Sequence, residues 1–252
     1  MTILILRPHP YGKKLAKKLS DLGFNTYNLP LIKFKEGKNL KLLPKIFTSL
    51  KDKDLIFVLS QQTIKYVNNF LKKLYLTWPM KPTYYAIGKN TALKLKKKIN
   101  KKINYPKNIE NMETLIDLLK LHDIKKKTAL ILQSNNSRKK LIKKLKKNGT
   151  KIISIECYKQ IKKKINKKKL IKKLKKHKIK EIVATSKKIL KKLYKLIPPK
   201  DRIKWLLNCK IIVISKRLAK IAYKLGWKKI YISDKANNNS LIKILKKIII
   251  IK

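Results

Sequence analysis

Small hydroxyl and turn residues recur along the chain where an apolar, strand-like segment gives way to a helical one. The first turn of a helix leaves backbone N–H groups without a partner and carries the positive end of the helix dipole, so such positions hold carboxylates well. A single Ser or Thr there is better explained as a helix N-cap, but the repetition of the pattern predicts a binding site for anionic groups. Thr91 lies one turn inside its helix, so capping explains it less easily. The residues of the pattern are Arg7, Pro8, Ser60, Gln61, Gly88, Thr91, Ser134 to Ser137, Thr185, Ser186, Ser215 and Arg217.

Tyr158 is the one side chain whose type and place suggest a chemical step. It follows the strand-like segment from Ile152 to Cys157. A phenol can donate a proton to a leaving hydroxyl when it is desolvated beside basic groups. A tyrosine that packs its ring at a domain edge and keeps its hydroxyl in water is an equally good interpretation. We expect Arg7, by contrast, to bind an anion and to matter little for stability.

The sequence lacks the motifs of several common classes of enzyme. It contains no Gly-x-Gly-x-x-Gly or Walker loop, so nucleotide binding by those routes has no support. Its 12 Asp and Glu residues form no evident catalytic pair, and its three histidines and two cysteines show no metal-ligand spacing. We expect no metal, no cofactor and no disulfide framework, and a reaction driven by substrate reactivity and steered by binding.

The elements that must position these residues alternate between strands and helices. Amphipathic helical segments, such as the one carrying Leu15, Leu19 and Leu22, separate most of the strands. This alternation predicts parallel sheets covered on both faces, and ten strands are better divided between two sheets of five. The predicted strands are 2–6, 24–29, 54–59, 83–87, 102–105, 128–132, 151–157, 180–184, 210–214 and 229–233.

A weak internal repeat indicates two similar α/β domains. The segment from Phe57 to Ser60 and its following elements have an echo that begins at Val183 to Ser186, although chance similarity in a lysine- and isoleucine-rich sequence also explains it. Extended stretches near 30–37 and 158–163 are the plausible crossings between domains. We therefore predict a discontinuous first domain, 1–33 with 161–252, and a second domain, 36–157.

The net charge of +57 is weak support for any particular partner. Clustered cations bind nucleic acid, but here they are nearly all lysine, spread along the whole chain, as codon bias would produce. The first residues carry no basic leader, and the apolar run from Ile248 to Ile251 is far shorter than the roughly 20 residues of a membrane helix. We expect a cytoplasmic monomer without a membrane or specific nucleic-acid partner.

The ordered series of segments resembles the uroporphyrinogen-III synthase family in its gammaproteobacterial form. The resemblance runs from Ile3 to about Lys247 and is most specific in Trp78-Pro79 with the segment from Tyr85 to Leu93. The other segments that carry it are Ile3 to Pro8, Asp54 to Gln61, Ala129 to Leu132 with Arg138, Glu156 to Tyr158, Val183 to Ser186, Trp205 to Leu207, Ser215 with Arg217 to Ala219, and Leu225 to Trp227.

The resemblance implies two flavodoxin-like, doubly wound parallel-sheet domains, joined by a two-stranded connector and separated by a cleft. It implies a cofactor-free lyase that cyclises hydroxymethylbilane, a linear tetrapyrrole with many carboxylates, to uroporphyrinogen III with inversion of ring D and loss of water. By the same resemblance, Tyr158 corresponds to a tyrosine of modest catalytic importance and Thr91 to a threonine at a helix start. The alternatives are a basic nucleic-acid-binding protein and a bilobed small-anion-binding protein without catalysis.

Overall fold

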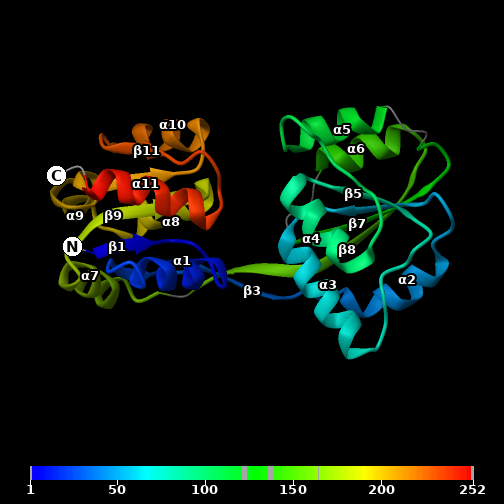
Figure 1. Cartoon of the computed structure of the whole chain (residues 1–252), viewed down its shortest axis with the longest axis horizontal. Helices are drawn as coiled ribbons and strands as arrows, with labels where there is room; N and C mark the ends of the chain where they lie inside the picture. Colours follow the sequence, from blue (N-terminus) through cyan, green and yellow to red (C-terminus); the bar gives the residue numbers. More distant parts are fainter. Residues whose placement is uncertain (1, 121–123, 136–138, 164, 251–252) are drawn as a thin grey trace. The chain divides into compact units, whose positions relative to one another are not determined.

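The computed structural model describes residues 2–120, 124–135, 139–163 and 165–250. The chain divides into two compact units (Figure 1): unit 1 is Met1–Lys33 with Ile161–Lys252, and unit 2 is Phe34–Gln160. The described residues form two separate sheets, one of five strands and one of six. The prediction of two doubly wound α/β sheets is therefore confirmed.

Unit 1 is built on a sheet whose strands all run parallel, in the order β11-β10-β9-β1-β2. Counted along the chain this order is 2-1-3-4-5, the arrangement of flavodoxin-like folds. Its elements are β1 (Thr2–Ile5), α1 (Tyr11–Ser20), β2 (Asn25–Asn28), α7 (Lys167–Lys176), β9 (Ile179–Ala184), α8 (Lys187–Leu196), α9 (Pro199–Lys204), η2 (Leu206–Asn208), β10 (Lys210–Val213), α10 (Lys216–Lys224), β11 (Ile230–Ile232) and α11 (Asn238–Ile250).

Every residue of β1 is buried, which shows that both faces of this sheet are covered. Ile3 and Ile5 belong to one core cluster, which also contains Leu15 and Leu19 of α1 and the buried leucines of α11. The alternate residue Leu4 points to the other face and is likewise fully buried. Residues on both faces of the strand are buried, which explains why the parallel strands appear in the sequence as uninterrupted apolar runs.

Unit 2 carries the six-stranded sheet, in the order β3-β8-β7-β4-β5-β6. Without β3, the strands read from β6 to β8 have the order 3-2-1-4-5, numbered along the chain. Each neighbouring pair from β8 to β6 is parallel. Its elements are β3 (Ile32–Glu36), η1 (Leu40–Leu42), α2 (Leu43–Ser49), β4 (Leu55–Val58), α3 (Gln61–Lys73), β5 (Thr83–Ala86), α4 (Lys89–Ile99), β6 (Ile103–Asn104), α5 (Met112–Lys120), β7 (Thr128–Ser134), α6 (Lys139–Lys147) and β8 (Lys151–Lys162).

The prediction of five strands per sheet was wrong for unit 2, because β3 adds a sixth strand at its edge. The segment Ile32–Glu36 alternates apolar and charged residues, a pattern typical of an edge strand with one solvated face. Among the described strands its neighbour is β8, which is distant in sequence. The local pattern therefore predicted an extended segment but not its partner.

The sheet of unit 2 separates two apolar cores. Leu55 and Phe57 face the core that contains Leu115 of α5 and Leu141 of α6. The alternate strand residues Ile56 and Val58 face the larger core, formed with α2, α3 and α4. Figure 1 shows α5 and α6 together on one side of the sheet and α2 and α3 on the other.

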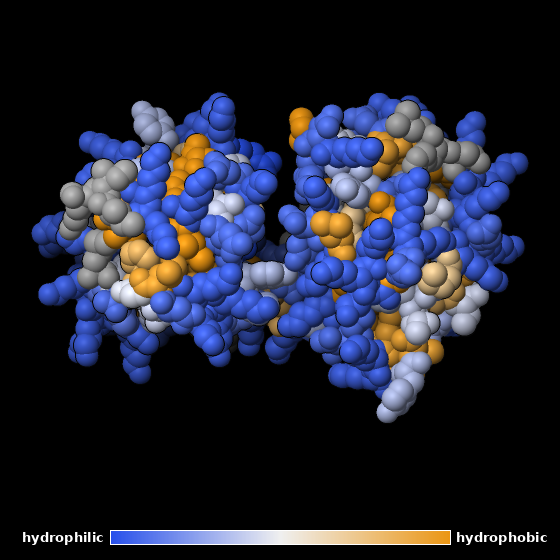
Figure 2. All heavy atoms as spheres, viewed as in Figure 1, coloured by the Kyte–Doolittle hydropathy of each residue, from blue (hydrophilic) through white to orange (hydrophobic). Residues whose placement is uncertain are grey.

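Lysine lies on the solvated faces of the helices, as expected. Along α6, Leu141 and Leu145 are buried while Lys143 and Lys146 are exposed. Hydrophilic side chains cover most of the visible surface of each unit (Figure 2). No helix in the described part of the chain is both long and apolar enough to cross a membrane.

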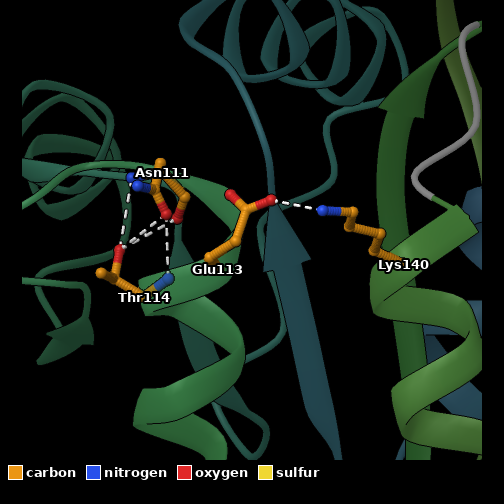
Figure 3. Close-up of polar contacts among 4 residues, drawn as sticks. All are labelled: Asn111, Glu113, Thr114 and Lys140. Carbon is orange, nitrogen blue, oxygen red and sulfur yellow. Dashed lines mark hydrogen bonds and ion pairs between the residues drawn. The ribbon is translucent and has the colours of Figure 1, made fainter.

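The start of α5 is fixed by a reciprocal cap (Figure 3). Asn111 Oδ1 accepts the backbone N–H of Thr114 at 2.9 Å, and Thr114 Oγ1 accepts the N–H of Asn111 at 3.4 Å. Glu113, in the first turn, forms an ion pair of 2.7 Å with Lys140 of α6. The cap satisfies helix N–H groups, whereas the ion pair joins two exposed side chains and contributes less.

We predict that Asn111→Ala lowers the free energy of unfolding by about 1 kcal/mol, because the first turn of α5 loses its side-chain acceptor. The matched change Lys140→Met, which removes the exposed ion pair, should cost less than about 0.5 kcal/mol. Urea denaturation of both variants measures the difference. Equal losses in the two variants would contradict this ranking.

Candidate functional site

The carboxyl ends of the parallel strands define one edge of each sheet. In unit 2, Val58 of β4 is in register with Leu132 of β7 on one side and with Ala86 of β5 on the other. Ser60, Ser134 and Gly88, each two residues beyond these registered positions, therefore lie in adjacent positions at this edge. The strand order reverses between β4 and β7, which is where doubly wound folds bind ligands.

A pair of hydroxyls joins two distant parts of unit 2 at this edge. Tyr158 Oη lies 3.1 Å from Ser60 Oγ, within hydrogen-bond distance. Ser60 is the N-cap of α3: its Oγ accepts the N–H of Thr63 at 3.1 Å and lies 3.0 Å from Thr63 Oγ1. Ser60 thus caps a helix, as expected for any single hydroxyl of the pattern, and also contacts the phenol.

Aromatic rings enclose Tyr158, which is only 5% exposed. The ring of Tyr66 stacks on it with centroids 5.7 Å apart, and the ring of Phe34 meets it edge-on at 5.6 Å. Partial burial, then the nearby carboxylate of Glu36 and the Tyr158 side chain, raise the pKa of Tyr66. Tyr158 is therefore largely shielded from water, unlike an edge tyrosine that keeps its hydroxyl in water.

A β-bulge in β8 sets the direction of the Tyr158 side chain. Strands β7 and β8 pair one to one as far as Gln133 and Glu156, but Ser134 then pairs with Tyr158, which leaves Cys157 as an extra residue. Side chains of a regular strand alternate between faces, so Cys157 and Tyr158 would otherwise point apart. Both instead belong to the core on the α3 and α4 side.

The remaining predicted residues of unit 2 lie at the same edge of the sheet, at or after the ends of β4, β5 and β7. Gly88 is the N-cap residue of α4, and Thr91, in the first turn, is buried. The carboxylate of Glu110 lies against Gly88, so close that an added Cβ would be 2.2 Å from Glu110 Oε2. Gln61 begins α3, and Ser134 ends β7. Ser137 and Arg138 lie outside the described residues.

Unit 1 brings its own predicted residues to the carboxyl edge of its sheet. Arg7 and Pro8 follow β1, Thr185 and Ser186 follow β9, and Ser215 follows β10. The side chains of Ser186 and Ser215 accept the N–H groups of Ile189 and Leu218 at 3.2 and 3.3 Å, as helix caps do. Arg217 lies exposed in the first turn of α10.

Arg7 is held by the segment that leads into α11. Its guanidinium donates to the carbonyl of Ala236 at 2.9 Å and to Asn238 Oδ1, and it lies over the ring of Tyr11. These contacts give Arg7 a structural role that the sequence did not indicate, because its hydrogen-bond partners Ala236 and Asn238 lie more than 200 residues away along the chain.

The backbone around Arg7 is equally constrained. Asn28 Nδ2 donates to the carbonyls of Ile5 and Arg7, at 2.8 and 3.1 Å. A Cβ on Gly12 would lie 2.2 Å from the same Arg7 carbonyl oxygen, so only glycine lets α1 approach the turn this closely. The turn after β1 is therefore held by both β2 and α1.

Several contributing residues were missed by sequence reasoning. Thr63 carried a usable signal, since it lies three residues after the N-cap Ser60, the spacing of a capping pair. Tyr66 and Phe34 carried none, because each meets Tyr158 only through tertiary packing.

A cavity of about 380 Å³ lies at the opposite, amino-terminal edge of the unit 1 sheet. Its lining includes Glu181, Trp205 and Cys209. Burial raises the pKa of Cys209 to about 12 and also raises that of Cys157, so both thiols are unreactive buried groups. Among the described residues, no three His, Cys, Asp or Glu side chains are grouped to hold a metal ion.

The family model described as uroporphyrinogen-III synthase HemD matches residues 13–243. The uroporphyrinogen-III synthase of Escherichia coli (strain K12) is 37% identical over 160 residues, which are 64% of this chain and 65% of that protein. The one from Proteus mirabilis is 35% identical over 161 residues, 64% of this chain and 81% of that protein. The match thus spans just under two thirds of the length of the E. coli relative.

Solved structures of similar fold extend over the whole chain. A mutant uroporphyrinogen III synthase from the extremely thermophilic bacterium Thermus thermophilus aligns with a TM-score of 0.66 and 14% identity, covering 100% of both chains. The uroporphyrinogen-III synthetase of Helicobacter pylori 26695 aligns with a TM-score of 0.59 and 17% identity, covering 98% of this chain and 99% of that one. At these identities the likeness shows the fold.

We predict that Arg7→Ala lowers the free energy of unfolding by about 1–2 kcal/mol, because its charged hydrogen bonds to the α11 segment are lost. Thermal or urea denaturation measures the loss. The control is Arg217→Ala, at an exposed position of the same edge, which should change stability by less than about 0.5 kcal/mol. A stability loss confined to the Arg217 variant would overturn the structural role of Arg7.

Proposed function

Because the chain belongs to the uroporphyrinogen-III synthase family, we propose that it cyclises hydroxymethylbilane to uroporphyrinogen III. In this reaction the terminal hydroxyl of the linear tetrapyrrole leaves, and an azafulvene forms. The far pyrrole ring attacks through its substituted carbon to give a spiro intermediate. That ring is then released and joined again in the inverted orientation, so that the net change is ring closure with loss of water.

The hydroxyl pair of Tyr158 and Ser60 is the observation that carries the proposed chemical step. Ser60 Oγ accepts the N–H of Thr63 and lies 3.0 Å from Thr63 Oγ1. When Thr63 Oγ1 donates to Ser60 Oγ, the hydrogen of Ser60 can be donated to Tyr158 Oη. The phenol hydrogen can then be donated to the departing hydroxyl of the substrate, whose loss needs a proton. Burial of Tyr158 among aromatic rings strengthens such a hydrogen bond by excluding water.

The helix starts at the sheet edges are proposed to bind the substrate carboxylates. Each offers backbone N–H groups and the positive end of a helix dipole, which favour anions. The proposed binding residues are Arg7, Pro8, Ser60, Gln61, Gly88, Thr91, Ser134, Thr185, Ser186, Ser215 and Arg217.

The main catalytic task is then conformational. The substrate closes unaided to the isomer without inversion, so the protein must hold it in a folded arrangement that favours attack by the substituted carbon. This task requires neither a metal nor a cofactor. We also propose 1–33 with 161–252, and 36–157, as the two domains, and a cytoplasmic monomer that retains nucleic acid only nonspecifically.

We predict that the purified protein, given fresh hydroxymethylbilane, raises the yield of isomer III over isomer I. The physical reason is that only bound substrate is kept from the unaided closure. Chromatographic separation of the isomers measures the ratio, with buffer and heat-denatured protein as controls. An isomer ratio equal to that of the buffer control would falsify the proposed activity.

We predict that Tyr158→Phe lowers kcat by roughly one to two orders of magnitude without abolishing turnover, because the phenol assists a departure that the substrate can undergo alone. Initial rates of isomer III formation measure it. Tyr75→Phe is the matched control, because Tyr75 is 97% exposed, in a loop away from this edge, and its rate should equal that of the wild type. Unchanged kinetics for the Tyr158 variant would remove Tyr158 from the chemistry.

A further inference from the structure

The Cys157 bulge is held from outside β8 by the chain that follows β3. The backbone N–H of Gly37 donates to the carbonyl of Cys157 at 3.1 Å. A Cβ built on Gly37 would lie 1.8 Å from the carbonyl oxygen of Glu156 and 2.7 Å from the carbonyl carbon of Cys157. Both obstacles are backbone atoms, so no side chain can rotate aside to make room.

Position 37 requires glycine because the backbone of β8 leaves no room for a side chain. The residue is buried against the bulge, and the distances to Glu156 and Cys157 exclude even a methyl group. Any larger residue must push β8 away or draw the chain after β3 outward. Either movement breaks the hydrogen bond from Gly37 to Cys157 and releases the extra residue of the bulge.

Release of the bulge would affect Tyr158 directly. The carbonyl of Tyr158 accepts the N–H of Asn135 at 3.2 Å, and Asn135 Oδ1 accepts the N–H of Gln160 at 3.1 Å, so the far side of the bulge is also fixed. Phe34, on the strand just before Gly37, packs edge-on against the Tyr158 ring. If the bulge were lost, the pairing of β8 with β7 would shift by one residue at this point. The phenol would then point to the opposite face of the sheet, away from Ser60.

We propose that Gly37 is a positioning residue for Tyr158: by leaving space for the Cys157 bulge, it directs the phenol to Ser60 Oγ. The placement of Tyr158 follows from the contacts alone, whereas the catalytic consequence rests on the proposed function. Gly37 itself need not touch the substrate.

The first test measures the contact between Tyr158 and Ser60 without an activity assay. The coupling between Ser60→Ala and Tyr158→Phe is obtained from a double-mutant cycle in urea unfolding, first in the wild-type background and then with Gly37→Ala. The wild-type background should show a favourable coupling, and Gly37→Ala should abolish it. A coupling that persists in the Gly37→Ala background would overturn the proposal.

The matched control is Gly149→Ala, in the same unit. Gly149 has φ +67° and no atom within 4 Å of an added Cβ, so alanine there strains the backbone without crowding a neighbour. The control should lose stability but keep the coupling between Ser60 and Tyr158. Loss of the coupling in this variant as well would show that general destabilisation explains the result, and the proposal would fail.

The second test concerns turnover. Gly37→Ala should lower kcat by about the same factor as Tyr158→Phe, with KM little changed, and the double variant should be no slower than either single one. Multiplied losses would mean that Gly37 acts independently of Tyr158 and would overturn the proposal. A wild type that forms no excess of isomer III would refute the proposed function, while the unfolding cycle would still decide the placement.

A third measurement covers the case in which Gly37→Ala does not fold. In the wild type, amide hydrogen exchange followed by NMR should show strong protection of the Gly37 and Asn135 N–H groups, which flank the bulge. An unprotected Gly37 amide would show that the chain after β3 does not hold the bulge, and would overturn the proposal.

Discussion

The parallel strands of each unit are buried on both faces. The polar groups at the carboxyl edge of each sheet depend on this constraint. From Leu55 to Val58 no residue is more than 2% exposed, so helices must lie on each side of β4. Parallel neighbours can then be joined only by crossovers, and every strand-to-helix turn of a unit emerges at the same edge. Hydroxyls and free backbone N–H groups gather at that edge because of chain direction, without needing to attract one another.

The gathered groups of unit 2 differ in how firmly they are held. Ser60 Oγ has three polar neighbours within 3.1 Å, and its phenol partner lies among aromatic rings. The start of α4 has no side-chain cap and lies next to the exposed Glu110. The hydroxyl pair is therefore held more firmly than the start of α4. The net charge of +57 adds a long-range attraction for anions of any kind.

Sequence reasoning succeeded where structure is locally determined. All ten predicted strands exist, and Ser60, Ser186 and Ser215 cap helices as their positions indicated, because burial pattern and capping depend on neighbours in the chain. It failed where a residue's environment comes from distant segments. The pairing of β3 with β8, the bulge at Cys157 and the contact of Arg7 with Asn238 have no local signature, and so the direction of Tyr158 was out of reach.

The interleaving of the units has a consequence for synthesis on the ribosome. Strand β1 can pair with β2 as soon as both emerge, but its other neighbour is β9, residues Ile179–Ala184, and its core is completed by Leu241 and Leu245. Unit 2 is translated in full between these two parts. It can therefore fold while the opening segment, from β1 to β2, still lacks the partner strand β9 at one edge.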